Sequence, residues 1–193
     1  GYVLTVNPNP PTPTTTTTTV PPRAGYLATY DASGSRGISV DSSKNAYTTG
    51  SFSGTVDFGG GDVTSNAVSD IFVVKLDSDG NFQWVYTAGG TQDGTSSTTL
   101  KFDGGTGIDI DSSGNVYITG IFDTVVDFGG GNVSSSGKDI FVLKLDTDGN
   151  FQWVYNVLSS GNDDANSITT DPSGNTYTTG YFYNTADFGG GDV

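Results

Sequence analysis

The eight-residue stretch VDFGGGDV at residues 56–63 occurs three times in this chain, and this repeat constrains the fold more than any other feature. The second copy, VDFGGGNV, covers residues 126–133, and the third, ADFGGGDV, covers residues 186–193. An Asp-Phe-Gly triplet also occurs in protein kinases, where its aspartate binds magnesium. The chain contains no histidine, so it lacks the His-Arg-Asp triplet of a kinase catalytic loop. The repeat therefore indicates an array of similar structural units.

The residue composition predicts an all-β chain. The chain has 29 glycines, and all of its 21 acidic residues are aspartates. Aspartate and glycine favour turns, whereas glutamate favours helix interiors. Short runs rich in valine, isoleucine, phenylalanine, tyrosine and threonine are typical of strands. No segment has helical periodicity over a useful length.

The charge balance and the missing residue types exclude several classes of function. The chain has seven lysines and arginines and 21 aspartates, so its net charge is −14. This negative charge argues against a nucleic-acid partner. No apolar run is long enough for a transmembrane helix, so we expect no membrane insertion. The absence of cysteine, histidine and methionine excludes disulfides, the usual zinc sites and sulfur oxidation, which suits an extracellular or cell-surface location. No signal peptide precedes Gly1, and we expect a processed or partial chain.

Two kinds of hairpin can be aligned between the copies. The first kind covers residues 37–52, 107–122 and 166–182, with a D-S-S-x-N or D-P-S-G-N turn. The second kind covers residues 70–88 and 139–157, with a D-x-D-G-N turn. A DFGGG loop joins the two hairpins, so each full unit has four antiparallel strands.

The spacing of the units is typical of propeller blades. Between the copies, 70 residues separate Asp57 from Asp127 and 60 separate Asp127 from Asp187, and the difference matches an insertion at 95–105. Four short strands in each unit at such a period are the sequence pattern of a β-propeller.

The stretch GIDIDSSGNVYITG, which follows FQWVYTAGGTQDG, closely resembles the bacterial and archaeal beta-propeller repeat known as the SBBP repeat. The resemblance covers about residues 25–193. It implies a propeller-like fold in secreted or surface proteins and says little about activity. The chain departs from the family in having only two complete units and an unusual insertion at 95–105.

Three segments are predicted along the chain. Residues 1–6 form an N-terminal strand, residues 7–24 form a linker with six of the seven prolines, and residues 25–193 form the repeat domain. At about 3.1 Å per residue, an extended linker of this length reaches roughly 50 Å. Its threonines are candidates for O-glycosylation, although a plain disordered linker explains them equally well; Asn132 begins an N-x-S sequon. The threonine candidates are Thr14, Thr15, Thr16, Thr17, Thr18 and Thr19.

Residues 24–34 occupy the place of a fourth strand, and residues 1–6 can supply its missing third strand. The predicted fold is therefore all-β, with propeller-like stacked four-stranded antiparallel blades, about three blades' worth, one of them split between the chain ends. Alternation, or contact with the next sheet, predicts the following buried side chains: Phe72, Val73, Leu76, Ile110, Phe141, Val142 and Leu145.

The D-x-D-G-N turns resemble half of a calcium-binding loop. The candidate ligands are Asp77, Asp79 and Asn81 in one turn and Asp146, Asp148 and Asn150 in the other. A full loop needs further ligands and a bidentate acid, and Asp-Gly is also expected in a plain hairpin turn. We therefore expect no cofactor, with calcium as the one possibility.

The F-x-W-x-Y stretches at 82–86 and 151–155 place aromatic side chains on one strand face. Packing between stacked sheets explains such a repeated stripe, and a sugar-binding platform is the alternative. No pair of carboxylates stands out as a catalytic acid and base, so we expect neither catalytic residues nor enzymatic activity.

These features predict an extracellular structural protein, a self-assembling filament or surface-layer subunit whose partners are copies of itself. Fewer than four blades leave open edges, which pair with other chains. Residues Tyr2, Val3, Leu4 and Val6 would join subunits by adding a β-strand to the unfinished blade of a neighbour. The same strand could instead close its own chain. The rival function is an adhesion or glycan-binding propeller, possibly calcium-stabilised, and an enzyme is a distant third.

Overall fold

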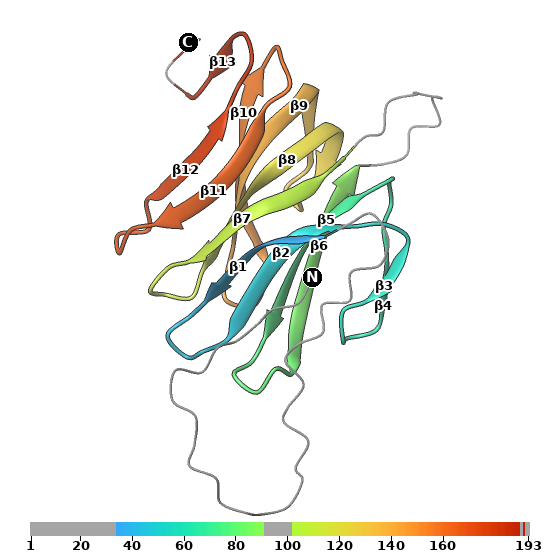
Figure 1. The fold of residues 1–193 in the computed structure, drawn as a ribbon, viewed down its shortest axis with the longest axis vertical. Coiled ribbons are helices and arrows are strands. Elements are labelled where there is room, and N and C mark those ends of the chain that lie inside the picture. The colour runs from blue at the N-terminus through green and yellow to red at the C-terminus, as the bar shows by residue number, and fades with distance from the viewer. Residues whose placement is uncertain (1–33, 91–101, 190, 192–193) are drawn as a thin grey trace, which may run out of the picture.

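The computed structural model describes residues 34–90, 102–189 and 191. Within these ranges the chain is all-β, as predicted, and its thirteen strands form antiparallel sheets without a helix (Figure 1). It follows that the described part of the chain includes no helix able to cross a membrane.

The predicted hairpins form two four-stranded units and one two-stranded unit. Unit 1 consists of β1 (Ser35–Val40), β2 (Ala46–Phe52), β5 (Asp70–Leu76) and β6 (Phe82–Gly90), paired in that order. Unit 2 consists of β7 (Gly104–Ile110), β8 (Val116–Asp127), β9 (Asn132–Leu145) and β10 (Phe151–Ser159). Unit 3 contains β11 (Asp164–Thr170) and β12 (Thr176–Tyr181).

The repeated DFGGG stretch is the turn of a further hairpin, whereas the sequence predicted a plain loop. In unit 1 it connects β3 (Thr55–Asp57) to β4 (Asp62–Thr64), and in unit 2 it connects β8 to β9. The carboxylate of Asp57 accepts the N–H groups of Gly59 at 2.7 Å and Gly61 at 2.9 Å. Because both glycines have φ of 110°, this turn requires residues without a side chain.

These extra hairpins also join consecutive units. The end of β6 pairs with the end of β8, with Gly89 opposite Asp127 and Gly90 opposite Val126. The end of β10 pairs in the same way with β13 (Ala186–Asp187), with Leu158 opposite Asp187. Each of these two copies of the stretch therefore hydrogen-bonds to the last strand of the preceding unit, which explains the repetition.

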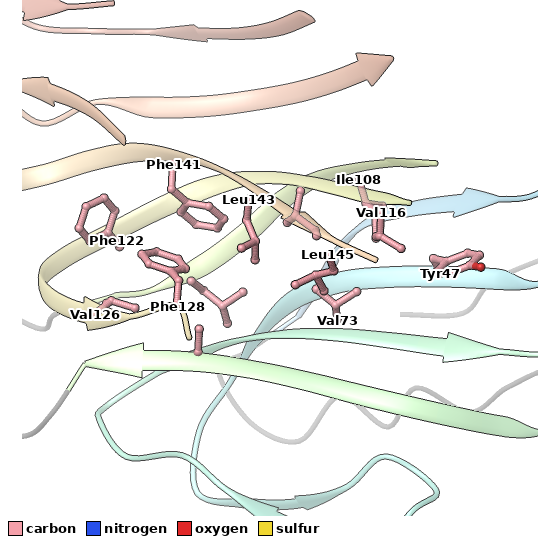
Figure 2. Close-up of a cluster of buried hydrophobic side chains, with 13 residues drawn as sticks. Tyr47, Val73, Ile108, Val116, Phe122, Val126, Phe128, Phe141, Leu143 and Leu145 are labelled. Carbon is pink, nitrogen blue, oxygen red and sulfur yellow. The ribbon is translucent and has the colours of Figure 1, made fainter. Parts of the chain in front are cut away.

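Side chains fill the space between units. β7 packs against β1 and β2, and β11 packs against β7 and β8 (Figure 1). The largest buried cluster joins Ile71 and Val73 of unit 1 to side chains of unit 2. Figure 2 shows Phe122, Phe128 and Phe141 together in this cluster, where the Phe128 and Phe141 ring centroids lie 5.0 Å apart. The core therefore lies between the sheets as well as within them.

Most of the predicted core side chains are buried. The buried ones are Phe72, Val73, Phe141, Val142 and Leu145. Leu76 and Ile110 are only partly buried and pack against the edges of the clusters. Both are the last residues of their strands, so the adjoining turns leave them partly open.

We expect Phe128→Ala and Phe188→Ala to differ strongly, although the two phenylalanines occupy the same place in the repeat. Phe128 is fully buried and Phe188 is 51% exposed. Removing the Phe128 ring leaves a cavity and should lower the free energy of unfolding by about 3–5 kcal/mol. The exposed substitution should cost less than about 1 kcal/mol. Urea unfolding in dilute solution, followed by tryptophan fluorescence, measures both; equal losses would contradict the burial described here.

Candidate functional site

The outer edge of β12 is the most prominent unpaired feature of the fold. β12 pairs with β11 from Thr176 to Tyr181 and has no second partner strand among the described residues. In units 1 and 2 the corresponding strands β2 and β8 pair along their length with β5 and β9. β12 therefore presents a row of backbone groups at the side of the molecule (Figure 1).

Aromatic side chains that are buried in units 1 and 2 are exposed in unit 3. Tyr177 is 58% exposed, whereas Tyr117 at the same repeat position is 1% exposed. Phe182 is 40% exposed, whereas Phe122 is fully buried. Among the described residues, unit 3 thus carries core-type side chains without the strands that cover their counterparts in units 1 and 2.

A groove of about 520 Å³ lies beside these aromatic residues. Its walls come from β9 and β10 of unit 2 on one side, including Val142 and Tyr155, and on the other side from β12, including Thr178, and from Phe182, which follows β12. At the contact between units 1 and 2, side chains of β9 such as Phe141 occupy the corresponding position. The groove is therefore the place where the third strand of unit 3 would lie.

Two contacts repeated in units 1 and 2 show what such a strand would meet. The Thr49 hydroxyl donates to the Phe72 carbonyl at 2.8 Å, and the Thr119 hydroxyl donates to the Phe141 carbonyl at 3.0 Å. The corresponding Thr179 is exposed.

The register of the complete units adds a second requirement. Phe72 lies opposite Gly50, and Phe141 lies opposite Gly120. A Cβ atom on Gly120 would first meet the Gly104 carbonyl of the adjacent β7 and would also lie 2.8 Å from the Phe141 ring, so the glycine is required by the neighbouring backbone as well as by the aromatic side chain. An added strand in the same register would place a large residue opposite Gly180.

The aromatic stripes differ between the units. Trp84 packs against the core of unit 2 and its Nε1 donates to the Thr147 carbonyl at 3.3 Å. The Tyr86 hydroxyl donates to the Phe128 carbonyl at 2.7 Å. These contacts support the packing interpretation for unit 1. On β10, Trp153 and Tyr155 are 39% and 41% exposed and border the unfinished unit.

The aspartates proposed as calcium ligands act as acceptors within their own turns. One carboxylate oxygen of Asp77 accepts hydrogen bonds from the backbone N–H groups of Asp79 and Asn81. The other oxygen accepts hydrogen bonds from the side-chain amide groups of Asn81 and Gln83. Asp146 has the equivalent contacts with Asp148, Asn150 and Gln152. Nowhere in the described ranges do three or more potential metal-ligating acids gather. Calcium at these turns stays a prediction.

The remaining predicted site residues fall mostly outside the described residues. This applies to Tyr2, Val3, Leu4 and Val6 and to the threonines Thr14, Thr15, Thr16, Thr17, Thr18 and Thr19. Asn132 is exposed at the start of β9, and its glycosylation stays a prediction. Sequence reasoning did not identify Tyr177, Phe182 and Phe188 as site residues, although their alignment with the core of unit 2 was available as a signal.

The chain is similar in sequence to a known repeat protein. No family model matches the chain. It is 30% identical over 139 residues to the uncharacterized WD repeat-containing protein L264 of Acanthamoeba polyphaga mimivirus. The match covers 62% of this chain and 9% of that protein. It supports a relationship to β-propeller-like repeat proteins in general and does not address the SBBP repeat.

The turn aspartates predict a loss of stability in acid. Hydrogen bonds from the side chain and backbone of Asn81 hold the pKa of Asp77 below its usual value, and Asn175 does the same for Asp171. Because the folded pKa values lie below the unfolded value of 3.8, their stabilising effect is present above about pH 4 and is lost as the pH falls through the folded values. We therefore expect the free energy of unfolding to decrease below about pH 4.

The control is a variant in which Asp77, Asp146 and Asp171 are all replaced by asparagine. Urea unfolding at a series of pH values should show a weaker acid dependence for this variant than for the wild type. An identical dependence in the two proteins would mean that the turns do not contribute to it.

Proposed function

We propose that the chain is the subunit of an extracellular filament or surface layer, in which a β-strand from one copy completes unit 3 of another. The proposed architecture is an open stack of propeller-like blades. The observation that carries the proposal is the unpaired edge of β12 beside the exposed Tyr177, Phe182 and Phe188.

An added strand satisfies both deficits of unit 3. It supplies partners for the backbone groups of β12 and covers the apolar groove beside it. Full burial of a large apolar side chain contributes roughly 1.5–3 kcal/mol, so covering these half-exposed aromatic residues offsets part of the entropy that a short segment loses when it is ordered.

Residues 1–6, with the sequence GYVLTV, fit the register of the complete units. If Tyr2 takes the place of Phe72, it lies opposite Gly180, Val3 lies opposite Thr179 and Leu4 lies opposite Thr178. Tyr2, Leu4 and Val6 then share one face of the strand, as Phe72, Val74 and Leu76 do in β5. The Tyr2 carbonyl would accept the Thr179 hydroxyl, as the Phe72 carbonyl accepts that of Thr49.

The linker at 7–24 gives this strand enough reach to enter another copy. Its prolines limit the conformational freedom that is lost on ordering. Because the donor strand and the acceptor groove are different surfaces, the contact is heterologous, and it propagates into an open fibre when the rotation between copies does not close a ring. The proposal includes no enzymatic activity and no cofactor.

Engineered cysteines test the register and the identity of the donor together. The chain has no cysteine of its own, so no native thiol competes in Val3→Cys/Thr179→Cys, and the single variants Val3→Cys and Thr179→Cys show whether like positions pair with each other. Side chains directly opposite each other lie about 4.5–5.5 Å apart at Cβ, close enough for oxidation to join them. We expect a ladder of covalent oligomers on a non-reducing gel. The control Val3→Cys/Thr178→Cys should give no ladder, because Thr178 faces the other side of the sheet.

A single disulfide within one chain would show that the strand closes its own subunit, and exchange between copies would be wrong. Absence of any disulfide in the Val3/Thr179 variant of the assembled protein would exclude residues 1–6 from the groove in this register.

The alternative function is a glycan-binding or adhesion module, possibly calcium-stabilised. The observation that favours it is the presence of Tyr155, Tyr181 and threonine hydroxyls at the groove, because sugars bind to aromatic faces with polar groups nearby. Negative-stain microscopy separates the two functions: long regular fibres are expected for the filament, and small discrete particles for the module.

A further inference from the structure

Two pairs of buried aspartates lie where consecutive units meet. The four residues are Asp70 and Asp103 between units 1 and 2, and Asp139 and Asp163 between units 2 and 3; all are 3% exposed or less. The pairs are equivalent, because Asp103 accepts the N–H of Asp123 and Asp163 accepts the N–H of Tyr183, in both cases 20 residues later. The fold thus places two carboxylates at each of these contacts.

The first pair is saturated with backbone hydrogen bonds. Asp70 accepts the N–H groups of Asn66 at 2.8 Å and Ala67 at 3.2 Å, one on each oxygen. Asp103 accepts the N–H groups of Gly90 and Asp123, also one on each oxygen. Each of these four oxygens therefore has a donor.

The second pair has buried oxygens without a donor. The Oδ2 atoms of Asp139 and Asp163 are both buried and have no hydrogen-bond partner. The Asp139 carboxylate also accepts hydrogen bonds from the backbone of Ser136 and Ser159, and its Oδ1 accepts the Ser159 hydroxyl at 3.4 Å; Oδ1 of Asp163 accepts the Tyr183 N–H at 3.1 Å. A buried carboxylate oxygen without a hydrogen-bond partner costs folding free energy, so a ligand bound to these two atoms would stabilise the fold.

Short contacts hold these carboxylates in one place. The Asp163 N–H donates to the carbonyl of Lys138, the residue before Asp139, at 2.7 Å. The Ser159 hydroxyl, which reaches Asp139, also lies 3.4 Å from the Gly161 carbonyl. Burial, together with the charge of Asp163, raises the pKa of Asp139.

In the part of the chain that the structure describes, no cationic side chain forms an ion pair with either of these carboxylates. The Lys138 ammonium bonds to Asp164 at 2.9 Å, at the partly exposed rim. One proton would neutralise only one of the two carboxylates, whereas the charge of a divalent cation matches that of both.

We propose that Asp139 and Asp163 bind a calcium ion between units 2 and 3. Their Oδ2 atoms are the charged ligands, and the Ser159 hydroxyl and the Gly161 carbonyl are neutral oxygens in the same place. Calcium takes oxygen ligands in irregular arrangements, whereas magnesium demands a near-ideal octahedron. Softer metals prefer thiolate or imidazole ligands, which this chain lacks. The ion would fix unit 3 against unit 2.

Calcium binding to the full-length chain after treatment with EDTA tests this site. We expect titration calorimetry to find a calcium site, and calcium at about 100 times its Kd to raise the Tm by roughly 5 °C or more. Asp139→Asn/Asp163→Asn should abolish both effects, and Asp163→Asn alone should weaken binding about tenfold or more. The matched control Asp62→Asn changes an exposed aspartate of β4 that belongs to neither candidate calcium site, and it should leave both effects unchanged. Circular dichroism checks that each variant is folded. If the double variant is unfolded, calcium binding by Asp163→Asn alone tests the site.

Three results would overturn the proposal. The wild type could bind no calcium, or Asp163→Asn could bind it as tightly as the wild type. Binding lost in Asp148→Asn but kept in Asp163→Asn would assign the calcium to the turn instead. The free energy of unfolding could also rise when the pH is lowered from 7 to 5 and stay the same when calcium is added. That result would show that protons neutralise the pair.

Discussion

The arrangement of the units depends on one constraint: the backbone groups at each strand edge need hydrogen-bond partners. Each four-stranded unit leaves edges, and the short DFGGG hairpin of one unit covers the end of the last strand of the unit before it. This pairing brings β7 against β1 and β11 against β7, so that side chains of neighbouring units form a common core. The position of β12, and with it the unfilled groove, follows from the same pairing.

The local elements of the fold could be predicted from the sequence because their signals are local. In each of the five D-x-x-x-N turns, the aspartate accepts the N–H groups two and four residues later, as in Asp111 with Ser113 and Asn115. These bonds involve only residues of the turn, so the sequence pattern is sufficient to place the hairpins. Alternation then identified Val73 and Phe141 as core residues.

The contacts between units could not be predicted in the same way. Pairing of Gly89 with Asp127 joins residues far apart in the chain, and neither residue carries a strand signal of its own. Burial of Asp139 and Asp163 depends on how units 2 and 3 pack against each other. From the sequence alone, an aspartate in a turn-rich chain is expected to be exposed. Exposure of Phe182 depends on strands that unit 3 lacks among the described residues.

A helical reconstruction of the assembled protein by electron cryomicroscopy tests strand exchange between copies. We expect one extra strand hydrogen-bonded to the outer edge of β12, continuous with a neighbouring copy, with an aromatic side chain over Gly180. A bare β12 edge in a regular fibre would contradict strand exchange, and so would a strand there that belongs to the same chain.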